Sequence, residues 1–195
     1  MKFYIIFGPP GAGKGTQSAL LARKYSLLHI STGDMLRKEI EAGTELGVKV
    51  KQTIESGKLV EDETMLRLIK KTISEPKEGI KGFIFDGFPR TLPQAEALDK
   101  MLSERDNHIS AVIYLDIDED IMFKRIAYRA RMEDRKDDME RSTIENRMVQ
   151  YHTKTEPLIV YYSNKGIFYR IKGDKSIEEN FKEICSIIDK IEYKR

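Results

Sequence analysis

Short apolar runs alternate along this chain with longer segments of helical period, and this alternation predicts the architecture. The apolar runs lie at residues 3–7, 27–30, 83–85, 111–115 and 167–171. A helical segment follows each run, which is the pattern of parallel strands joined by helical crossovers. Because such crossovers are right-handed, we expect an α/β fold with a doubly wound, five-stranded parallel sheet. Its ligand crevice should lie where the strands end.

Two stretches do not fit simple crossovers. Residues 31–81 contain three helix-like segments, at 32–43, 45–57 and 62–75, which is too many for one connection. We therefore predict that residues 31–60 form a small inserted helical subdomain within a single domain spanning 1–195. Residues 130–141 are rich in charge and poor in apolar side chains, so we predict a short, mobile lid between two helices.

Composition and charge limit the class of protein. The 195 residues include 34 basic and 32 acidic side chains, a formal net charge of +2, which gives no overall field for nucleic acid or an anionic membrane. The apolar runs are too short to span a bilayer. A lone cysteine, Cys185, leaves no internal disulfide framework. We expect a cytoplasmic monomer that acts on small molecules.

A glycine-rich segment carries the strongest chemical signal. The sequence GPPGAGKGT at 8–16 follows an apolar run and precedes a helical segment, which is the context of a phosphate-binding loop (P-loop). Its backbone amides and the helix N-terminus suit a polyphosphate, and Lys14 adds a point charge. The hydroxyl that usually follows the lysine comes one place late, because Gly15 precedes Thr16. A chance glycine turn beside a stray lysine is the alternative.

The markers of a GTPase switch are missing. Such a protein needs a DxxG segment and an NKxD guanine-reading segment. The run at 86–89 reads DGFP, with Pro89 in the place of the glycine, and the run at 164–167 reads NKGI, with Ile167 in the place of the acid. The switch hypothesis loses both supports.

Arginines gather instead at positions that folding alone does not explain. Arg37 lies on the first inserted helix, Arg90 follows the third predicted strand, and six of the 23 residues at 125–147 are arginines. Arg125 and Arg129 are four residues apart, so they share a helix face. Each one alone could be a solvated charge paired with an acid. Together with the phosphate loop, they predict planar donors that converge on several phosphates.

Six motifs follow one another over essentially the whole chain. They are GPPGAGKGTQ at 8–17, STGDMLR at 31–37, GKLVEDE at 57–63, FDGFPRTLPQAEAL at 85–98, RKDD at 135–138 and YHTKTEPLIVYY at 151–162. In this order and spacing they resemble the adenylate kinases, nucleoside monophosphate kinases, in their short-lid form. The resemblance implies reversible phosphoryl transfer from MgATP to AMP, giving two ADP. An acceptor phosphate that is already ionised needs no catalytic base, and the three histidines are scattered.

The resemblance also implies roles for individual residues. Those that would bind ATP are Gly11, Ala12, Gly13, Lys14, Gly15, Thr16, Arg125, Arg129 and, against the base, Gly173. Those that would bind AMP are Thr32, Arg37, Lys58, Leu59, Val60, Gly87, Phe88, Pro89, Arg90, Gln94, Arg135 and Arg147. Those that would stabilise the charge of the transferring group are Lys14, Arg90, Arg125, Arg135 and Arg147.

Two other functions stay open at this point. UMP/CMP kinases resemble this chain but have Ala and Asn where it has Thr32 and Gln94, and a Gln amide matches the donor and acceptor of adenine. A non-catalytic ATP-binding sensor could use the same phosphate loop, although binding alone would not need so many arginines. Product assays with each nucleoside monophosphate separate the three.

The metal expectations also come from the resemblance. Magnesium would be coordinated by the nucleotide phosphates and by water, and Asp86 would hold one of its bound waters. The alternative for Asp86 is that it caps the turn that follows. Thr16 would then meet a phosphate oxygen. The lid departs from the usual glycine and serine turn, so either Arg131 or Arg135 could reach the phosphate, and the register of RKDD favours Arg135. No structural zinc is expected, because the lid is short and has no cysteine.

Overall fold

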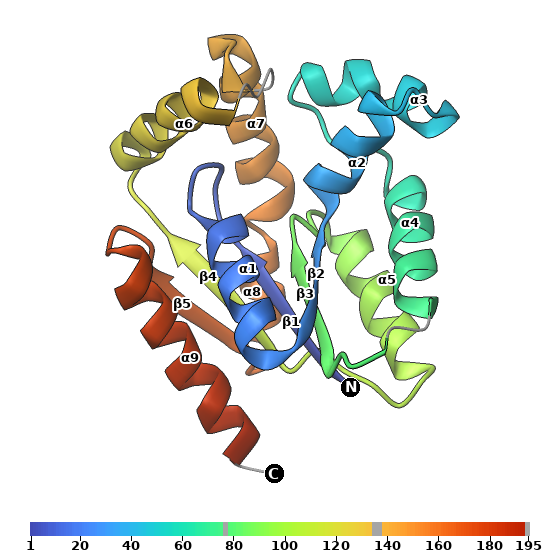
Figure 1. Cartoon of the computed structure of the whole chain (residues 1–195), viewed down its shortest axis with the longest axis vertical. Coiled ribbons are helices and arrows are strands. Elements are labelled where there is room, and N and C mark those ends of the chain that lie inside the picture. Colours follow the sequence, from blue (N-terminus) through green and yellow to red (C-terminus); the bar gives the residue numbers. More distant parts are fainter. Residues whose placement is uncertain (76–77, 134–137, 194–195) are drawn as a thin grey trace.

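The computed structural model describes residues 1–75, 78–133 and 138–193, and within them the predicted fold is confirmed. One all-parallel sheet has the strand order β2-β3-β1-β4-β5, with helices on both faces (Figure 1). Its strands are β1 (Lys2–Phe7), β2 (Leu27–Ser31), β3 (Gly82–Asp86), β4 (Ala111–Asp116) and β5 (Phe168–Lys172). Each predicted run falls within a strand to within a residue at either end.

The alternating side chains of the central strand serve two apolar cores. Phe3, Ile5 and Phe7 pack into one cluster of buried residues, whereas Tyr4 and Ile6 pack into another. The first core lies under α4 (Asp62–Ser74), α5 (Leu92–Ser103) and α8 (Leu158–Ser163), and the second lies under α1 (Lys14–Tyr25) and α9 (Ile177–Tyr193). A strand that is buried on both faces needs apolar residues at every position, which explains the unbroken run FYIIF.

The strand register brings several loops to one edge of the sheet. Ile6 of β1 pairs with Asp86 of β3, which pairs in turn with Ser31 of β2, so these three strands end together. The segments that follow them are the phosphate loop, the DGFPR run and the start of α2 (Thr32–Glu41). The chain adds β2 and β3 on one side of β1 and then β4 and β5 on the other, and ligand crevices form at such switch points.

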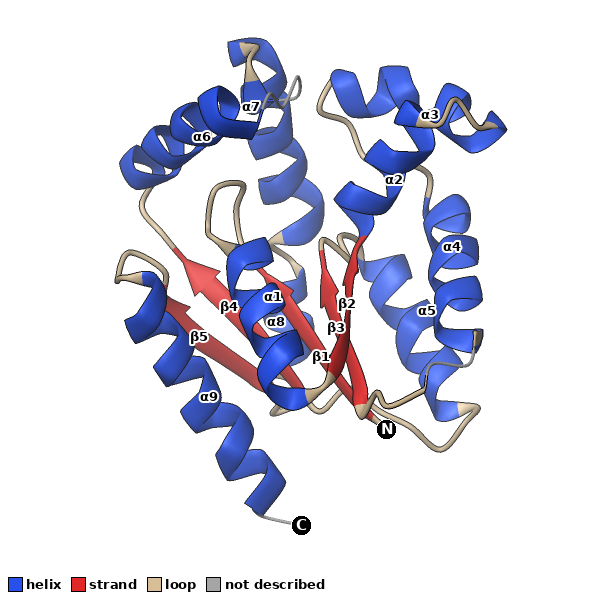
Figure 2. Cartoon of the chain, viewed as in Figure 1, coloured by secondary structure: helices blue, strands red, loops and turns tan. Residues whose placement is uncertain are grey.

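Three helices occupy residues 31–81, as the sequence predicts. Helix α2 and helix α3 (Glu45–Glu55) stand above the sheet edge, while α4 runs down beside α5 (Figure 2). Hydroxyl caps start two of them: Ser31 Oγ accepts from the Asp34 amide at 3.3 Å, and Thr44 Oγ1 accepts from the Gly47 amide at 3.0 Å. Helix α4 contributes Met65 and Ile69 to the sheet core, so it belongs to the return crossover.

The predicted lid is partly helical. Helix α6 (Glu119–Glu133) continues through the first four lid residues, and α7 (Arg141–Gln150) begins with the last. Strong helix formers such as Ala130, Arg131 and Met132 explain why α6 extends so far. A π-helical turn, Tyr151–Thr155, joins α7 to α8, with the Glu156 amide donating to the Tyr151 carbonyl at 2.8 Å.

Cys185 on α9 is a free thiol that is buried in the second core. None of the helices in the described parts of the chain combines the length and the apolarity needed to cross a membrane.

Candidate active site

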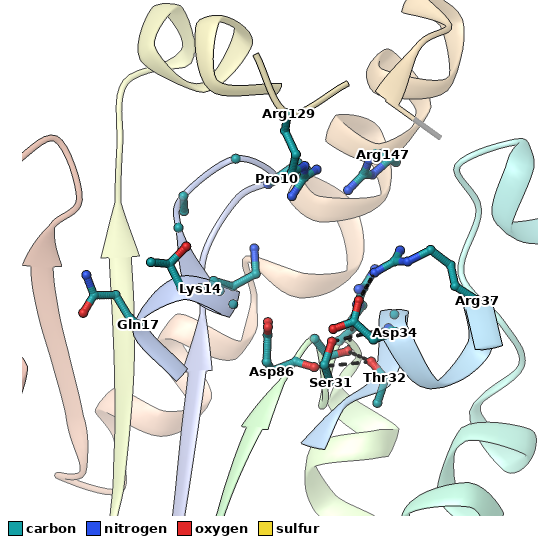
Figure 3. A pocket seen from close by; sticks show the side chains of 18 of the residues that line it. Pro10, Lys14, Gln17, Ser31, Thr32, Asp34, Arg37, Asp86, Arg129 and Arg147 are labelled. Atoms are coloured by element: carbon teal, nitrogen blue, oxygen red, sulfur yellow. Dashed lines mark hydrogen bonds and ion pairs between the residues drawn. The ribbon is translucent and has the colours of Figure 1, made fainter. Parts of the chain in front are cut away.

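A cavity of about 710 Å³ lies at the carboxyl edge of the sheet, and residues of α2, α3, α6 and α7 line it. Figure 3 shows Arg129 and Arg147 above Lys14 and Arg37 at the right of the view, with the arginine side chains turned toward the space between them. The predicted site residues that line this cavity are Gly11, Ala12, Gly13, Lys14, Gly15, Thr16, Thr32, Arg37, Lys58, Leu59, Val60, Asp86, Gly87, Arg90, Gln94, Arg125, Arg129 and Arg147.

Three predicted site residues, Phe88, Pro89 and Gly173, are not among those that line the cavity. Phe88 is fully buried against Phe85, and a cis peptide bond joins it to Pro89. The Gly173 carbonyl accepts a hydrogen bond of 2.8 Å from Arg125 Nη1, so Gly173 positions an arginine of the cavity. Arg135 lies outside the described residues.

The phosphate loop needs its glycines for two different reasons. At Gly8 the backbone has φ +149°, and a Cβ would come within 2.4 Å of the Leu115 carbonyl oxygen. Gly11 has φ +77° and lies against Met122 of α6. Only glycine combines these dihedral angles with such close approach. The loop is thereby pressed against β4 and α6.

The position after Lys14 faces an acid. A Cβ on Gly15 would lie 3.4 Å from Oδ2 of Asp86, which is ordinary van der Waals contact. A hydroxyl side chain there would extend toward the Asp86 carboxylate, which already presents oxygens to this part of the cavity. Asp86 is nearly buried, and its Oδ2 lies 3.5 Å from Nε2 of His29. His29 also lines the cavity, although no role was predicted for it.

Lys14 is held in an unusual electrostatic state. Its ammonium donates to the carbonyl oxygens of Gly8 at 3.0 Å and Pro9 at 2.9 Å. Burial lowers the pKa of Lys14 to about 7. The nearby carboxylate of Asp86 raises this pKa, but the positive charges of Arg90, Arg129 and Arg147 lower it again. The cavity therefore carries positive charge in excess, and an anionic ligand would relieve the repulsion.

One buried carboxylate holds two arginines of the cavity. Asp138 Oδ2 accepts from Arg129 Nε at 2.6 Å and its Oδ1 accepts from Nη2 at 2.9 Å, while Arg147 Nη1 donates to Oδ1 at 2.5 Å. Burial alone would raise the pKa of the Asp138 carboxyl, but the two guanidinium groups outweigh it and hold that pKa below the ordinary value. Sequence reasoning missed this role, although the RKDD motif contains Asp138.

Backbone and side-chain contacts fix Arg90 and the base of α2. Arg90 Nε donates to the Gly87 carbonyl at 2.8 Å, and Thr32 Oγ1 donates to the same carbonyl at 2.9 Å. The Arg90 carbonyl accepts from Thr155 Oγ1 of the π-helical turn at 2.9 Å. Arg37 is paired with Asp34, one turn earlier on α2.

The inserted helices touch the helix that follows the lid. Thr143 Oγ1 on α7 donates to the Glu55 carbonyl at 3.0 Å, and Asn146 Nδ2 donates to the Ser56 carbonyl at 3.2 Å. Gly57 fits closely here, because a Cβ would lie 2.5 Å from the Thr143 carbonyl oxygen. These contacts connect α7 to the end of α3, on the two sides of the cavity.

The doubly wound sheet, the phosphate loop and the ring of cations define a P-loop phosphotransferase. The chain belongs to the adenylate kinase family, whose sequence pattern, described as Adenylate kinase, matches residues 6–167. It is similar to the adenylate kinases of Bacteroides fragilis, 46% identical over 95% of this chain and 97% of that one, and Archaeoglobus fulgidus, 44% identical over 96% and 98%. An adenylate kinase of Synechococcus sp. is 40% identical over 97% and 100%. The resemblance in the motifs is confirmed.

The depressed pKa of Lys14 predicts that ATP binding takes up a proton. The protonated amine is the form that attracts phosphate, so above pH 7 the free protein must gain a proton on binding, and affinity should fall as pH rises. Calorimetry of ATP binding at pH 8 in buffers of different ionisation heat should report an uptake approaching one proton. Lys14→Arg, which does not titrate, should abolish it. A wild-type heat that is independent of buffer would contradict the assignment.

The buried position of Asp138 predicts a pH-dependent loss of stability in Asp138→Asn. Two guanidinium groups would lose their shared anion, which should lower the free energy of unfolding by about 1–3 kcal/mol at pH 7. Because folding lowers the carboxyl pKa below its ordinary value of 3.8, this contribution is complete above 3.8 and is lost as pH falls through the folded value. Urea titrations at pH 7 and at pH 3 should therefore show the variant and the wild type converging in acid.

The matched control for Asp138 is Glu145→Gln. Glu145 pairs with Arg141 on the exposed face of α7, the helix that carries Arg147, so its loss should cost less than about 1 kcal/mol. An equal loss in both variants would rule out a special role for Asp138.

Proposed function

We propose that this member of the adenylate kinase family transfers the γ-phosphoryl group of ATP to AMP, reversibly, within the single cavity described above. The observation that carries the proposal is that Lys14, Arg90, Arg129 and Arg147 line one cavity, with the phosphate loop on one side and the inserted helices on the other. One such space can hold two anionic nucleotides with their phosphates facing each other, which is the geometry that in-line transfer requires.

ATP would lie on the side of the phosphate loop. The amides of Gly11 to Thr16 would surround its phosphates at the N-terminus of α1, and Lys14 would exchange its carbonyl partners for phosphate oxygens. Arg125 and Arg129 would reach the same phosphates from α6. Gly173, which fixes Arg125, would also place backbone against the base.

AMP would lie between residues 31–60 and the DGFPR run. Arg37 would leave Asp34 for the AMP phosphate, where Arg90 and Arg147 would join it. Thr32, Gln94, the backbone of residues 58–60 and that of residues 87–89 would enclose the adenine. Gln94 and Thr32 favour AMP over the pyrimidine monophosphates.

Charge stabilisation would carry the chemistry. The AMP phosphate attacks as an anion, so the protein supplies donors for the equatorial oxygens of the transferring group rather than a base. Lys14, Arg90, Arg125, Arg147 and the lid residue Arg135 would share this task. Each such arginine can contribute a thousandfold or more in rate, in the order of magnitude known for related transfers.

The residues at the strand end fit a nucleotide-bound magnesium ion. Asp86 presents a nearly buried carboxylate to the cavity beside Gly15, where oxygen ligands and water suit this hard cation. Asp86 would hold a bound water and Thr16 a phosphate oxygen. When bound, magnesium neutralises charge on the transferring phosphates.

Closure of two segments would keep water from the activated phosphate. Residues 130–141 would act as the lid and residues 31–60 as the AMP-binding insertion. The hydrogen bonds from α7 to the carbonyls of Glu55 and Ser56 support direct contact between the two sides during catalysis. We propose further that the protein works as a cytoplasmic monomer without structural zinc.

Assays with MgATP and each nucleoside monophosphate test the proposal directly. Rapid formation of ADP with AMP, and slow product formation with UMP and CMP, is the expected result. Rapid turnover of UMP and CMP would instead support a pyrimidine nucleotide kinase, and absence of turnover with every acceptor would support a sensor.

Arg90→Lys should lower turnover far more than it weakens ATP binding. The guanidinium is assigned to the AMP phosphate and the transferring group, where lysine loses the bidentate geometry, so kcat should fall by about a hundredfold or more. The dissociation constant of ATP, measured without AMP, should change less than about threefold, on the basis that ATP lies on the other side of the cavity. Equal losses in both quantities would contradict the assigned role.

A further inference from the structure

We propose that Asp62, at the start of α4, is a specificity-determining residue that locks the amide of Gln94 in the orientation that accepts adenine and rejects 6-oxopurines. The inference rests on the proposed placement of AMP against Gln94. It concerns a residue outside the cavity lining, which acts through Gln94 rather than by touching the base.

The Gln94 amide is fixed by two different partners. Its Nε2 donates to Asp62 Oδ1 at 2.7 Å, and its Oε1 accepts from the Arg90 backbone amide at 2.8 Å. The Gln94 residue is only 2% exposed, although it lines the cavity. One N–H of Nε2 and one lone pair of Oε1 remain for a ligand.

These partners permit a single orientation of the amide. A carboxylate only accepts hydrogen bonds, and a backbone N–H only donates them. Rotating the amide by 180° would set Oε1 against the Asp62 carboxylate and Nε2 against the Arg90 N–H. Both hydrogen bonds would be lost at a buried site, and two like poles would face each other at each end.

Asp62 is itself held in place. Its Oδ1 also accepts from Thr91 Oγ1 at 3.0 Å. The same hydroxyl caps α5 by accepting from the backbone N–H of Gln94 at 3.3 Å. The carboxylate thus ties the start of α4 to the start of α5. This connection keeps the Gln94 side chain and the backbone of residues 58–60 in one register around the base.

The fixed orientation matches one class of purine. Adenine carries an amino donor at position 6, which suits the free lone pair of Oε1, and a ring acceptor beside it suits the free N–H. A 6-oxopurine carries an acceptor at position 6, so it would meet Oε1 with repulsion. A freely rotating glutamine amide could serve either base by turning over, whereas the locked one cannot.

The test measures AMP against inosine monophosphate, a 6-oxopurine, in the wild type, Asp62→Asn and Glu63→Gln. Asparagine can donate as well as accept, so Asp62→Asn removes the lock, and the ratio of kcat/KM for the two acceptors should fall by about tenfold or more. The change should appear chiefly as a lower KM for inosine monophosphate, with KM for ATP unchanged within about twofold. Glu63→Gln, on the next and exposed residue, should leave the ratio at the wild-type value.

A second measurement does not depend on the folding of any Asp62 variant. In amide NMR spectra of the ligand-free wild type, one Nε2 proton of Gln94 should be shifted downfield and protected from exchange, because it bonds the Asp62 carboxylate and Gln94 itself is buried. Rapid exchange of both protons would overturn the inference. So would an unchanged acceptor ratio in a folded Asp62→Asn.

Gln94→Leu separates this inference from the proposed function. If Gln94→Leu leaves KM for AMP unchanged, the base does not lie against Gln94, and the placement of AMP is wrong. If Gln94→Leu raises that KM while Asp62→Asn keeps the wild-type acceptor ratio, AMP is correctly placed and the lock alone is refuted.

Discussion

The structure depends on holding like charges together around one cavity. Burial, together with repulsion from Arg90, Arg129 and Arg147, brings the pKa of Lys14 down to about 7. The fold opposes this repulsion with a few fixed acceptors: the carbonyls of the phosphate loop for Lys14, Gly87 for Arg90, and Asp138 for the other two arginines. Nucleotide phosphates then enter a field that is already organised for them.

The acceptors differ in whether a bound phosphate can replace them. Lys14 and Arg37 hold partners that a phosphate can replace, namely loop carbonyls and the carboxylate of Asp34. Asp138 is different, because it is buried and bonds two arginines that come from separate helices. It therefore couples α6 to α7 across the lid, and α7 in turn contacts the inserted helices through Thr143 and Asn146.

Much of the site could be predicted because parallel sheets gather strand ends. Once the apolar runs are assigned to strands, the phosphate loop, the DGFPR run and the start of α2 must share one edge, and the residues after each run become neighbours. The extent of the lid was less predictable, since charged segments of strong helix formers such as 130–133 satisfy a loop pattern and a helix pattern equally. Residues that act by holding another side chain, such as Asp62 and Asp138, leave no distinct sequence signal, because the sequence does not tell a paired aspartate from a solvated one.

The sequence by itself determined the order of elements, the phosphate loop and the set of arginines, because strand burial, glycine geometry and charge type are local properties of residue order. Only the tertiary structure decided which carboxylate pairs with which arginine or amide side chain. The pairing of Asp138 with Arg129 and Arg147, and that of Asp62 with Gln94, each depend on where helices cross after folding. Those crossings follow from the packing of two apolar cores on either face of β1, and no local pattern along the chain encodes them.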